Sequence, residues 1–236
     1  MSNEQQIGLY ETGIHPCSYI PGKDAATQFL DPRLRIGADI AEQLAQLGFR
    51  RSGEHTYRPH CPGCNACIPL RVRVQDFQPN RTQRKVLNRN QDVGLEITEP
   101  AVTLEYYRLY RRYINQRHQD GDMFPPTAKQ YADFLAVDSG YTKFWEFREK
   151  DQLLGIAVTD HFQEALSAVY SYYIPDQAYS RRSLGVYFVL RQIMAAKDLG
   201  YPYLYLGYLI RECRKMSYKT DFPPLEQLVG HQWQNL

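Results

Sequence analysis

Three cysteines are spaced closely enough to bind one metal ion. The segment CPGCNAC at 61–67 separates Cys61, Cys64 and Cys67 by two residues each, and thiolates in such a tight loop converge on a soft cation. Zinc or an iron–sulfur cluster needs four ligands. The further candidates are Cys17, His60 and His15. We therefore predict a zinc or iron–sulfur site at Cys17, Cys61, Cys64 and Cys67. The alternative is a set of reduced or redox-active thiols that bind no metal.

A second segment has the charge to bind an anion. Residues 50–90 carry nine Lys or Arg against two acids, a local charge of +7 in a chain whose net charge is +2. Arginine recognises phosphate through paired hydrogen bonds, and nearby aromatic residues suit a single-stranded RNA end. The alternative is a solvated charged face. The residues that we expect to bind the anion are Arg71, Arg73, Arg81, Arg84, Lys85 and Arg89.

A third segment, SRRSLGVYF at 180–188, is expected to join a strand to a helix. Backbone N–H groups at a helix start bind anions, and Ser183 could cap this helix. We therefore expect Arg181, Arg182, Ser183 and Gly185 to bind a phosphate or a carboxylate. The segment partly resembles the Arg/Gln-x-x-Gly-x-Gly/Ala pattern by which acyltransferases of the N-acetyltransferase-like fold hold coenzyme A. Tyr187 stands where that pattern has its final small residue.

Several common catalytic motifs are absent from the sequence. It has no GxxxxGK[ST] phosphate loop, no GxGxxG, no GxSxG and no HExxH, and its six histidines show no catalytic spacing. An acyl transfer by this chain would therefore need a donor that is already activated.

The hydrophobic pattern predicts the elements that position these residues. Apolar residues at helical spacing after Asp31-Pro32 predict a helix that ends at Gly48. Alternation in 68–74 predicts a strand with Arg71 and Arg73 on one face. Helices are predicted from about 102 and after Thr127, followed by three strands, a helix over about 184–199 and a last strand. This order predicts an α/β (α+β) fold with a helix packed on a sheet. We place a division near residue 100, between a basic cysteine-containing module (1–100) and a C-terminal domain (101–236).

We expect a cytosolic protein. No stretch approaches the roughly 20 apolar residues of a membrane helix, and MSNEQQIGLY lacks the basic start and apolar run of a secretory signal.

Several uncommon strings together resemble one family. They include HPCSYIPGKDAATQFLDP (15–32), 48–92, LSAVYSYYIPD (166–176), RRSLGVYFVLRQI (181–193), GYPYLYLGYLI (200–210) and KMSYKTDFPPLEQLVG (215–230). In these the chain resembles the bacterial aspartate/glutamate leucyltransferases, relatives of the eukaryotic arginyl-tRNA–protein transferases. The resemblance implies an N-acetyltransferase-like (GNAT) C-terminal domain behind the cysteine-containing module. It also implies transfer of leucine from leucyl-tRNA to the α-amine of proteins that begin with Asp or Glu, which marks them for degradation in the N-degron pathway. The partners would be leucyl-tRNA and those proteins, without a membrane, and the transfer would require no cofactor.

The chemistry of that reaction agrees with the residues. An aminoacyl ester is already activated, and an α-amine with a pKa of about 7.7–8.0 is partly neutral at cytosolic pH. Positioning and dipoles that stabilise an oxyanion can then supply the catalysis. We predict catalytic roles for Tyr170, Tyr172 and Tyr208 on the strands that flank the expected cleft, with simple packing as the alternative. Arg181 or Arg182 would line a cationic pocket for the acidic acceptor residue.

Two other functions stay open on the residues alone. One is a coenzyme A-dependent N-acyltransferase that uses the same helix start. The other is a non-catalytic, zinc-bearing RNA-binding protein, which would bind tRNA without transferring anything to protein.

Overall fold

The computed structural model describes residues 8–236. Residues 1–7 form most of the terminus in which we expect no secretory signal, and they lie outside the described residues.

The N-terminal part forms a small antiparallel sheet, a two-stranded hairpin and one helix. Its elements are β1 (Leu9–Glu11), β2 (His15–Pro16), β3 (Asp24–Ala25), β4 (Thr27–Leu30), α1 (Ala38–Gln46), β5 (Arg50–Ser52) and β6 (His55–Pro59). The sheet has the order β1-β4-β6-β5, and β2 pairs with β3.

The rest of the chain builds a larger mixed sheet. Its elements are β7 (Ile68–Arg73), α2 (Arg81–Arg89), β8 (Val93–Thr98), α3 (Leu104–Arg117), α4 (Ala128–Phe134), β9 (Thr142–Glu149), β10 (Gln152–His161), β11 (Ala165–Tyr173), the 3-10 helix η1 (Gln177–Arg182), α5 (Leu184–Asp198), β12 (Tyr203–Leu209), the 3-10 helix η2 (Arg214–Asp221), β13 (Leu225–Val229) and β14 (Gln232–Asn235). The strand order is β14-β13-β7-β12-β11-β10-β9-β8. Neighbours are antiparallel except β11 and β12, which are parallel and joined through α5.

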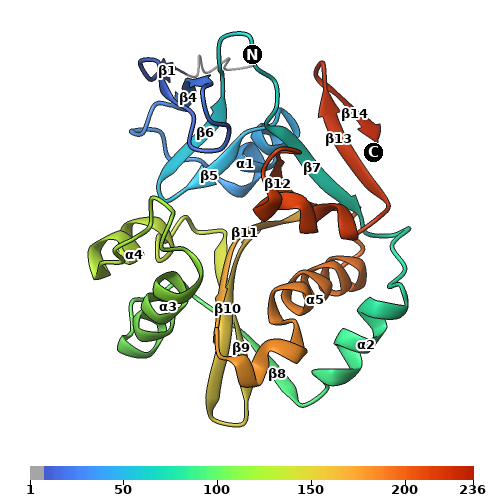
Figure 1. The fold of residues 1–236 in the computed structure, drawn as a ribbon. Helices are drawn as coiled ribbons and strands as arrows, with labels where there is room; N and C mark the ends of the chain where they lie inside the picture. Colours follow the sequence, from blue (N-terminus) through green and yellow to red (C-terminus); the bar gives the residue numbers. More distant parts are fainter. Residues whose placement is uncertain (1–7) are drawn as a thin grey trace.

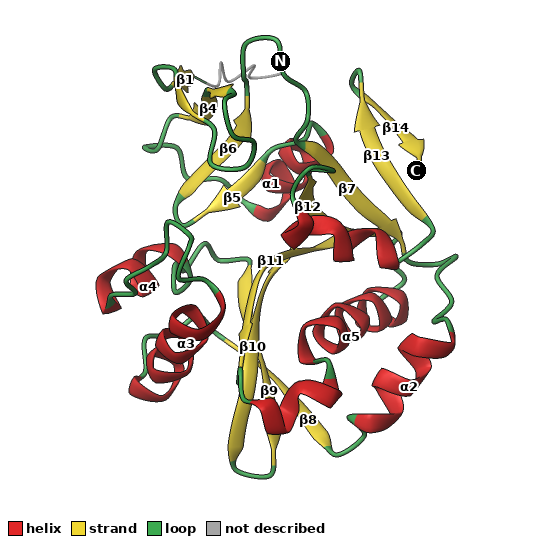
Figure 2. Cartoon of the chain, in the orientation of Figure 1, coloured by secondary structure: helices red, strands yellow, loops and turns green. Residues whose placement is uncertain are grey.

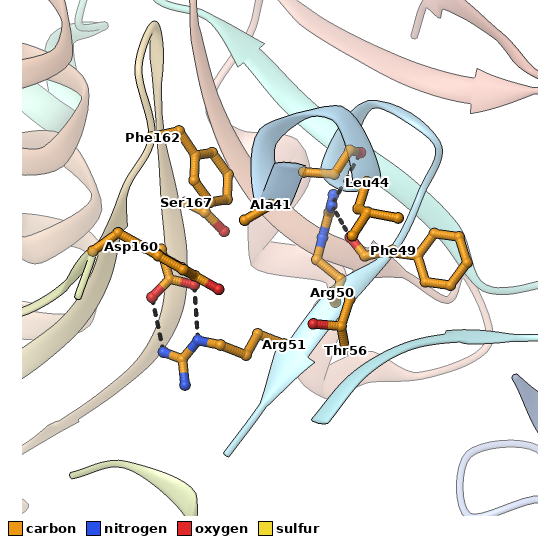
Figure 3. A pocket seen from close by; sticks show the side chains of 11 residues that line it. Ala41, Leu44, Phe49, Arg50, Arg51, Thr56, Asp160, Phe162 and Ser167 are labelled. Atoms are coloured by element: carbon orange, nitrogen blue, oxygen red, sulfur yellow. Dashed lines mark hydrogen bonds and ion pairs between the residues drawn. The ribbon is translucent and has the colours of Figure 1, made fainter. Parts of the chain in front are cut away.

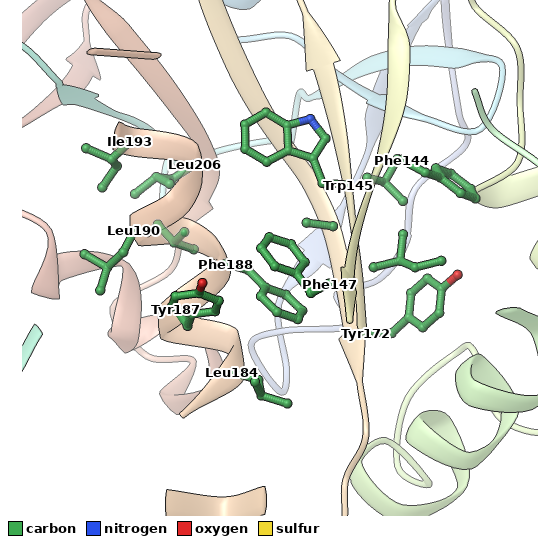
Figure 4. Packing of buried hydrophobic residues seen from close by; sticks show 14 of the residues in the cluster. Phe144, Trp145, Phe147, Tyr172, Leu184, Tyr187, Phe188, Leu190, Ile193 and Leu206 are labelled. Atoms are coloured by element: carbon green, nitrogen blue, oxygen red, sulfur yellow. The ribbon is translucent and has the colours of Figure 1, made fainter. Parts of the chain in front are cut away.

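Helices cover both faces of this sheet. Helices α3 and α4 lie on one side of β9–β11, while α5 and α2 lie on the other (Figures 1 and 2). The large core cluster fills both layers, and aromatic and aliphatic side chains together form the contact between α5 and the sheet (Figure 4). Phe147 of β9 stacks on Phe188 of α5 with ring centroids 3.9 Å apart. Gly155 permits this approach, because a Cβ there would lie 2.5 Å from the Phe188 ring. Tight packing at this point fixes α5, and with it the helix start, relative to β9 and β10.

The predicted α/β architecture is confirmed. The run of antiparallel strands β9, β10 and β11, followed by α5 and the parallel strand β12, is the order that the N-acetyltransferase-like expectation requires. The predicted strand at 68–74 forms as β7. The first predicted helix begins later than expected, at Ala38, because Asp31 accepts a hydrogen bond from the backbone of Arg33 (3.0 Å) in a turn that precedes it.

The larger sheet extends across the expected division at residue 100. Strand β7 lies between β12 and β13, and β8 forms an edge beside β9. The small sheet is also joined to the large one by a buried ion pair (Figure 3). Arg51 of β5 donates to both carboxylate oxygens of Asp160 on β10, at 3.0 and 2.8 Å. Residues 1–100 therefore contribute strands and a buried contact to the C-terminal half.

Candidate active site

The two parallel strands separate after a short paired stretch. Strands β11 and β12 pair only from Ala165 to Ser167 and from Tyr203 to Tyr205. Beyond that point 168–173 of β11 and 206–209 of β12 are not paired with each other, and we call this region the strand divergence. Both strands are irregular there: the register of β10 and β11 shifts at Val158/Thr159, and that of β12 and β7 shifts before Gly207, whose φ is +79°. Such bulges redirect side chains and occur next to active sites.

Tyr170 carries an unpartnered hydroxyl at this divergence. Its oxygen is buried and has no hydrogen-bond partner within residues 8–236. The ring packs against Phe134 of α4, with centroids 5.3 Å apart. Burial raises the pKa of Tyr170 above the ordinary value, and the neighbouring Tyr110, Tyr173 and Tyr218 raise it further. The hydroxyl is therefore protonated at neutral pH and can donate or accept a hydrogen bond, but it is not a base.

The other two predicted tyrosines have satisfied hydroxyls. Tyr172 is fully buried, and its hydroxyl lies 2.9 Å from that of Tyr131 on α4. The Tyr208 hydroxyl donates to the carbonyl oxygen of Gly48 at 2.7 Å, toward the N-terminal part. The structure does not bring the three hydroxyls together. These contacts favour the alternative of packing roles for Tyr172 and Tyr208, so the catalytic roles stay predictions and Tyr170 becomes the strongest of the three candidates.

A lysine that the sequence did not single out lies on the β12 side of the divergence. The Lys219 ammonium, on η2, donates to the carbonyl oxygen of Tyr208 at 2.6 Å. Burial lowers the pKa of Lys219 to about 8, and Arg50 lowers it further. In the sequence, Lys219 lies in the string KMSYKTDF. That string contributed to the family resemblance, but we assigned no chemical role to its residues.

The start of α5 lies on the β11 side. A Cβ on Gly185 would lie 3.2 Å from the ring of Tyr173, the last residue of β11. Ser183 has a left-handed backbone (φ 52°) and makes no side-chain cap. Arg182 forms ion pairs with Asp92 (2.7 Å) and Glu149. The predicted cap by Ser183 is therefore wrong, and Arg182 is already neutralised, whereas Arg181 is exposed.

Helix α2 presents a basic face next to that helix start. Asn80 begins the helix by accepting from the backbone of Gln83 at 2.9 Å, and the Gln83 side chain accepts from the Asn80 backbone. The Arg89 guanidinium donates to the carbonyl of Arg181 at 3.1 Å, which joins α2 to η1. The exposed basic residues that share one face of α2 are Arg81, Arg84, Lys85 and Arg89.

The two strand arginines do not belong to this face. Arg71 is buried between Tyr203 and Trp233, with its guanidinium 3.5 and 4.2 Å from their ring centroids, and it is paired with Glu226 at 2.6 Å. Arg73 is half exposed and lies 3.4 Å from Asp76. The prediction that Arg71 binds RNA is therefore corrected, because its charge and both of its faces are already occupied.

The four predicted metal ligands are neighbours. The backbone of His60 donates to Ala26 at 2.8 Å, which holds the 61–67 loop beside the β2–β3 hairpin and Cys17. Burial raises the pKa of Cys67 to about 12, and Cys61, Cys17 and Cys64 add to the shift. Within residues 8–236, however, no three His, Cys, Asp or Glu side chains are placed to hold a metal ion. The zinc or iron–sulfur site therefore stays a prediction, and no step below depends on it.

Within the described chain, no helix is long and apolar enough to cross a membrane.

Comparison with protein families defines the class of protein. The family described as "Arginine-tRNA-protein transferase, C terminus" matches residues 105–229, and "Arginine-tRNA-protein transferase, N terminus" matches residues 15–85. The chain therefore belongs to the arginine-tRNA-protein transferase family.

Individual relatives carry a more specific name. A protein of Chromohalobacter salexigens called "Aspartate/glutamate leucyltransferase" is 53% identical over 97% of this chain and 93% of its own. Proteins of the same name from Pseudomonas aeruginosa and Pseudomonas fluorescens are 48% and 46% identical, each over 99% of this chain and 98% of their own. Among solved structures, FemX is similar over 85% of this chain and 79% of its own, with a TM-score of 0.46 and 8% identity.

Proposed function

We propose that this protein transfers leucine from leucyl-tRNA to the α-amine of proteins that begin with Asp or Glu. The name shared by its relatives over nearly the whole chain supports this proposal. The observation that carries it is the strand divergence, where β11 bears the unpartnered hydroxyl of Tyr170 and β12 contacts the ammonium of Lys219, together with the exposed basic face of α2. We place the reaction in the cytosol and expect its products to enter the N-degron pathway.

The reaction needs no nucleotide and no enzyme nucleophile. The neutral α-amine of the acceptor attacks the ester carbonyl of leucyl-tRNA and forms a C–N bond. The C–O bond to the terminal ribose then breaks, and the proton lost by the amine ends on the ribose oxygen. Positioning of the two reactants and stabilisation of the oxyanion supply the rate enhancement. Tyr170 is suited to the second task, because its protonated hydroxyl has no other partner.

The two sides of the strand divergence suit the two substrates. On the β11 side, Arg181 and the basic face of α2 would bind phosphates of the tRNA acceptor end. Four exposed basic residues on one helix face can contact several phosphates of a nucleic-acid backbone at once, which one small anion does not offer. The β12 side is then left for the acceptor protein.

A transfer assay with the purified protein tests the proposal. The donors are labelled leucyl-tRNA, arginyl-tRNA and acetyl-coenzyme A, and the acceptors are peptides that begin with Asp, Glu, Arg or Ala. We expect label to pass only from leucyl-tRNA and only to the Asp and Glu peptides. Acetyl transfer without tRNA binding would indicate a coenzyme A-dependent acyltransferase. Bound tRNA without transfer to any peptide would indicate an RNA-binding protein.

A further inference from the structure

Lys219 and Arg50 are two cations with no acid beside them. Neither forms an ion pair with a carboxylate of residues 8–236. Both lie against the same residue of β12. The Arg50 guanidinium is 5.7 Å from the ring centroid of Tyr208, and the Lys219 ammonium is 2.6 Å from the carbonyl oxygen of Tyr208. Two cations removed from water in one place are unfavourable unless an anion compensates them.

The two side chains differ in which hydrogen-bond donors remain available to a ligand. Arg50 is buried, donates to the carbonyl oxygen of Phe49 at 2.8 Å, and lies over the rings of Tyr205 and Tyr208. Its Nε and one terminal nitrogen have no partner within residues 8–236, but they are closed off from solvent. Lys219 is less enclosed than Arg50, and within the described residues its ammonium makes a single hydrogen bond. Lys219 is therefore the cation with donors left for a ligand, while Arg50 adds positive potential beside it.

The place of Lys219 in the fold indicates which ligand it meets. The Tyr208 carbonyl belongs to the stretch 206–209 of β12, which β11 no longer pairs. A Cβ on the bulged Gly207 would lie 3.4 Å from the Lys219 ammonium, so the ammonium sits at the bulge itself. On the opposite side of the divergence, the helix start of α5 and the exposed cations of α2 are the groups that we expect to bind phosphate. The anion that remains on the β12 side is a carboxylate of the acceptor.

We propose that Lys219 binds the side-chain carboxylate of the N-terminal Asp or Glu of the acceptor protein, and so determines its specificity. This inference rests on the proposed function. It replaces Arg182 in the role of the cationic pocket, because Asp92 and Glu149 already neutralise Arg182. The single hydrogen bond to Tyr208 leaves two donors of the ammonium for two carboxylate oxygens.

The test compares substitutions of two lysines on η2. Lys219→Gln removes the proposed contact, Lys219→Arg keeps a cation, and Lys215→Gln is the matched control, because Lys215 is exposed and paired with Asp120 at 2.6 Å. For each protein, kcat/KM is measured with peptides that differ only in an N-terminal Asp or Asn, together with KM for leucyl-tRNA. The ratio of the two peptide values does not depend on how much of the protein is folded.

We expect Lys219→Gln to lower kcat/KM for the Asp peptide about 10- to 100-fold, as loss of a hydrogen bond to a charged group predicts. The Asp-to-Asn preference falls by the same factor, Lys219→Arg retains part of it, and KM for leucyl-tRNA changes less than twofold. An unchanged preference in Lys219→Gln, or an equal loss in Lys215→Gln, overturns the proposal. A rise in KM for leucyl-tRNA alone also overturns it, because Lys219 would then bind phosphate.

Direct binding separates this inference from the function itself. Fluorescence anisotropy of the labelled Asp and Asn peptides is measured with each protein in the absence of tRNA. Tighter binding of the Asp peptide that disappears in Lys219→Gln supports the carboxylate site even if no leucine is transferred. Transfer by the wild type, combined with equal binding of the Asp peptide to wild type and Lys219→Gln, rejects the inference and leaves the function standing.

Discussion

Tyr170 and Tyr172 lie on the same face of β11, two residues apart, but their hydroxyls have different surroundings. Tyr172 meets Tyr131 at 2.9 Å, whereas Tyr170 has no partner within residues 8–236. We expect Tyr170→Phe to leave stability unchanged or slightly higher, because no hydrogen bond is lost, and to lower the transfer kcat roughly 10-fold or more, by analogy with loss of an oxyanion donor. Chemical denaturation and single-turnover transfer measure the two effects.

Tyr172→Phe is the control for that experiment. It leaves the Tyr131 hydroxyl without its partner in the core, so we expect a loss of about 1–3 kcal/mol in the free energy of unfolding. Transfer per folded molecule should stay near the wild-type value. If Tyr170→Phe transfers as fast as the wild type, Tyr170 is only a packing residue.

The pKa of Lys219 predicts a pH dependence of stability. Burial and the charge of Arg50 lower it from 10.5 to about 8, while Cys213 acts in the opposite direction. Between about pH 8 and 10.5 the unfolded chain therefore binds the proton more tightly, so this group makes the folded state more stable as pH rises through the window. We expect the free energy of unfolding of the wild type, relative to Lys219→Met, to rise on the order of 2 kcal/mol across it. A flat difference, like that expected for Lys215→Met, would contradict the shifted pKa.

Single residues show which parts of the candidate site could be predicted from the sequence and which could not. The charge runs predicted two anion-binding segments, but the sequence did not reveal which of their cations the fold neutralises. Arg71 is paired with Glu226, and Arg182 with Asp92 and Glu149. Those partners are distant along the chain and meet only in the folded structure. Lys219 was missed for the same reason, since a lone lysine becomes unusual only when the fold removes acids from its surroundings.

At the scale of elements, α2 is expected to bind tRNA through its exposed face. Replacing Arg81, Arg84, Lys85 and Arg89 together by Gln should weaken binding and reduce the slope of log K against log salt by about 3, at roughly 0.7–0.9 per phosphate contact. Filter binding across a salt series measures this slope. The slope would stay unchanged if the face is merely solvated.

Arg71→Gln is the contrasting substitution. It leaves the partly buried Glu226 without its partner, so we expect a loss of about 2–4 kcal/mol in stability and an unchanged salt slope for the folded protein. A reduced slope in this variant would return Arg71 to the RNA-binding face.

The sequence predicted most elements but not all of their boundaries. Alternation gave β7, and the apolar repeat gave α5, because each element buries one continuous face. The start of α1 was misplaced, because Asp31-Pro32 has the residues of a helix start while Asp31 instead closes a turn with Arg33. Propensity alone does not distinguish these two uses of the same side chain.

At the scale of the whole molecule, β7 makes the two halves interdependent. Leu70 and Val72 are fully buried between β12 and β13, and the Arg51–Asp160 pair links the two sheets. We expect the fragment 101–236 to be unable to fold alone, because removing β7 exposes the centre of the large sheet. Circular dichroism and amide dispersion in NMR spectra measure this. A cooperatively folded fragment would support independent halves.

The same topology explains which features of the candidate site could be predicted from the sequence. The mixed sheet and its crossover helix follow from periodicity, so the general architecture was predictable. The strand divergence was not, because it depends on two bulges and on where the pairing of β11 and β12 stops. Tyr170 on β11, and Lys219 through its contact with β12, belong to the two strands that separate there, although they are far apart in the sequence.

The most direct measurement is the position of the new bond. The wild-type protein is mixed with leucyl-tRNA and an Asp-starting peptide that also contains an internal lysine, and the product is sequenced by tandem mass spectrometry. We predict one added leucine, joined through its carbonyl to the α-amine of Asp, without any nucleotide triphosphate in the mixture. Free leucine with an unmodified peptide, or leucine on the lysine side chain, would contradict the account.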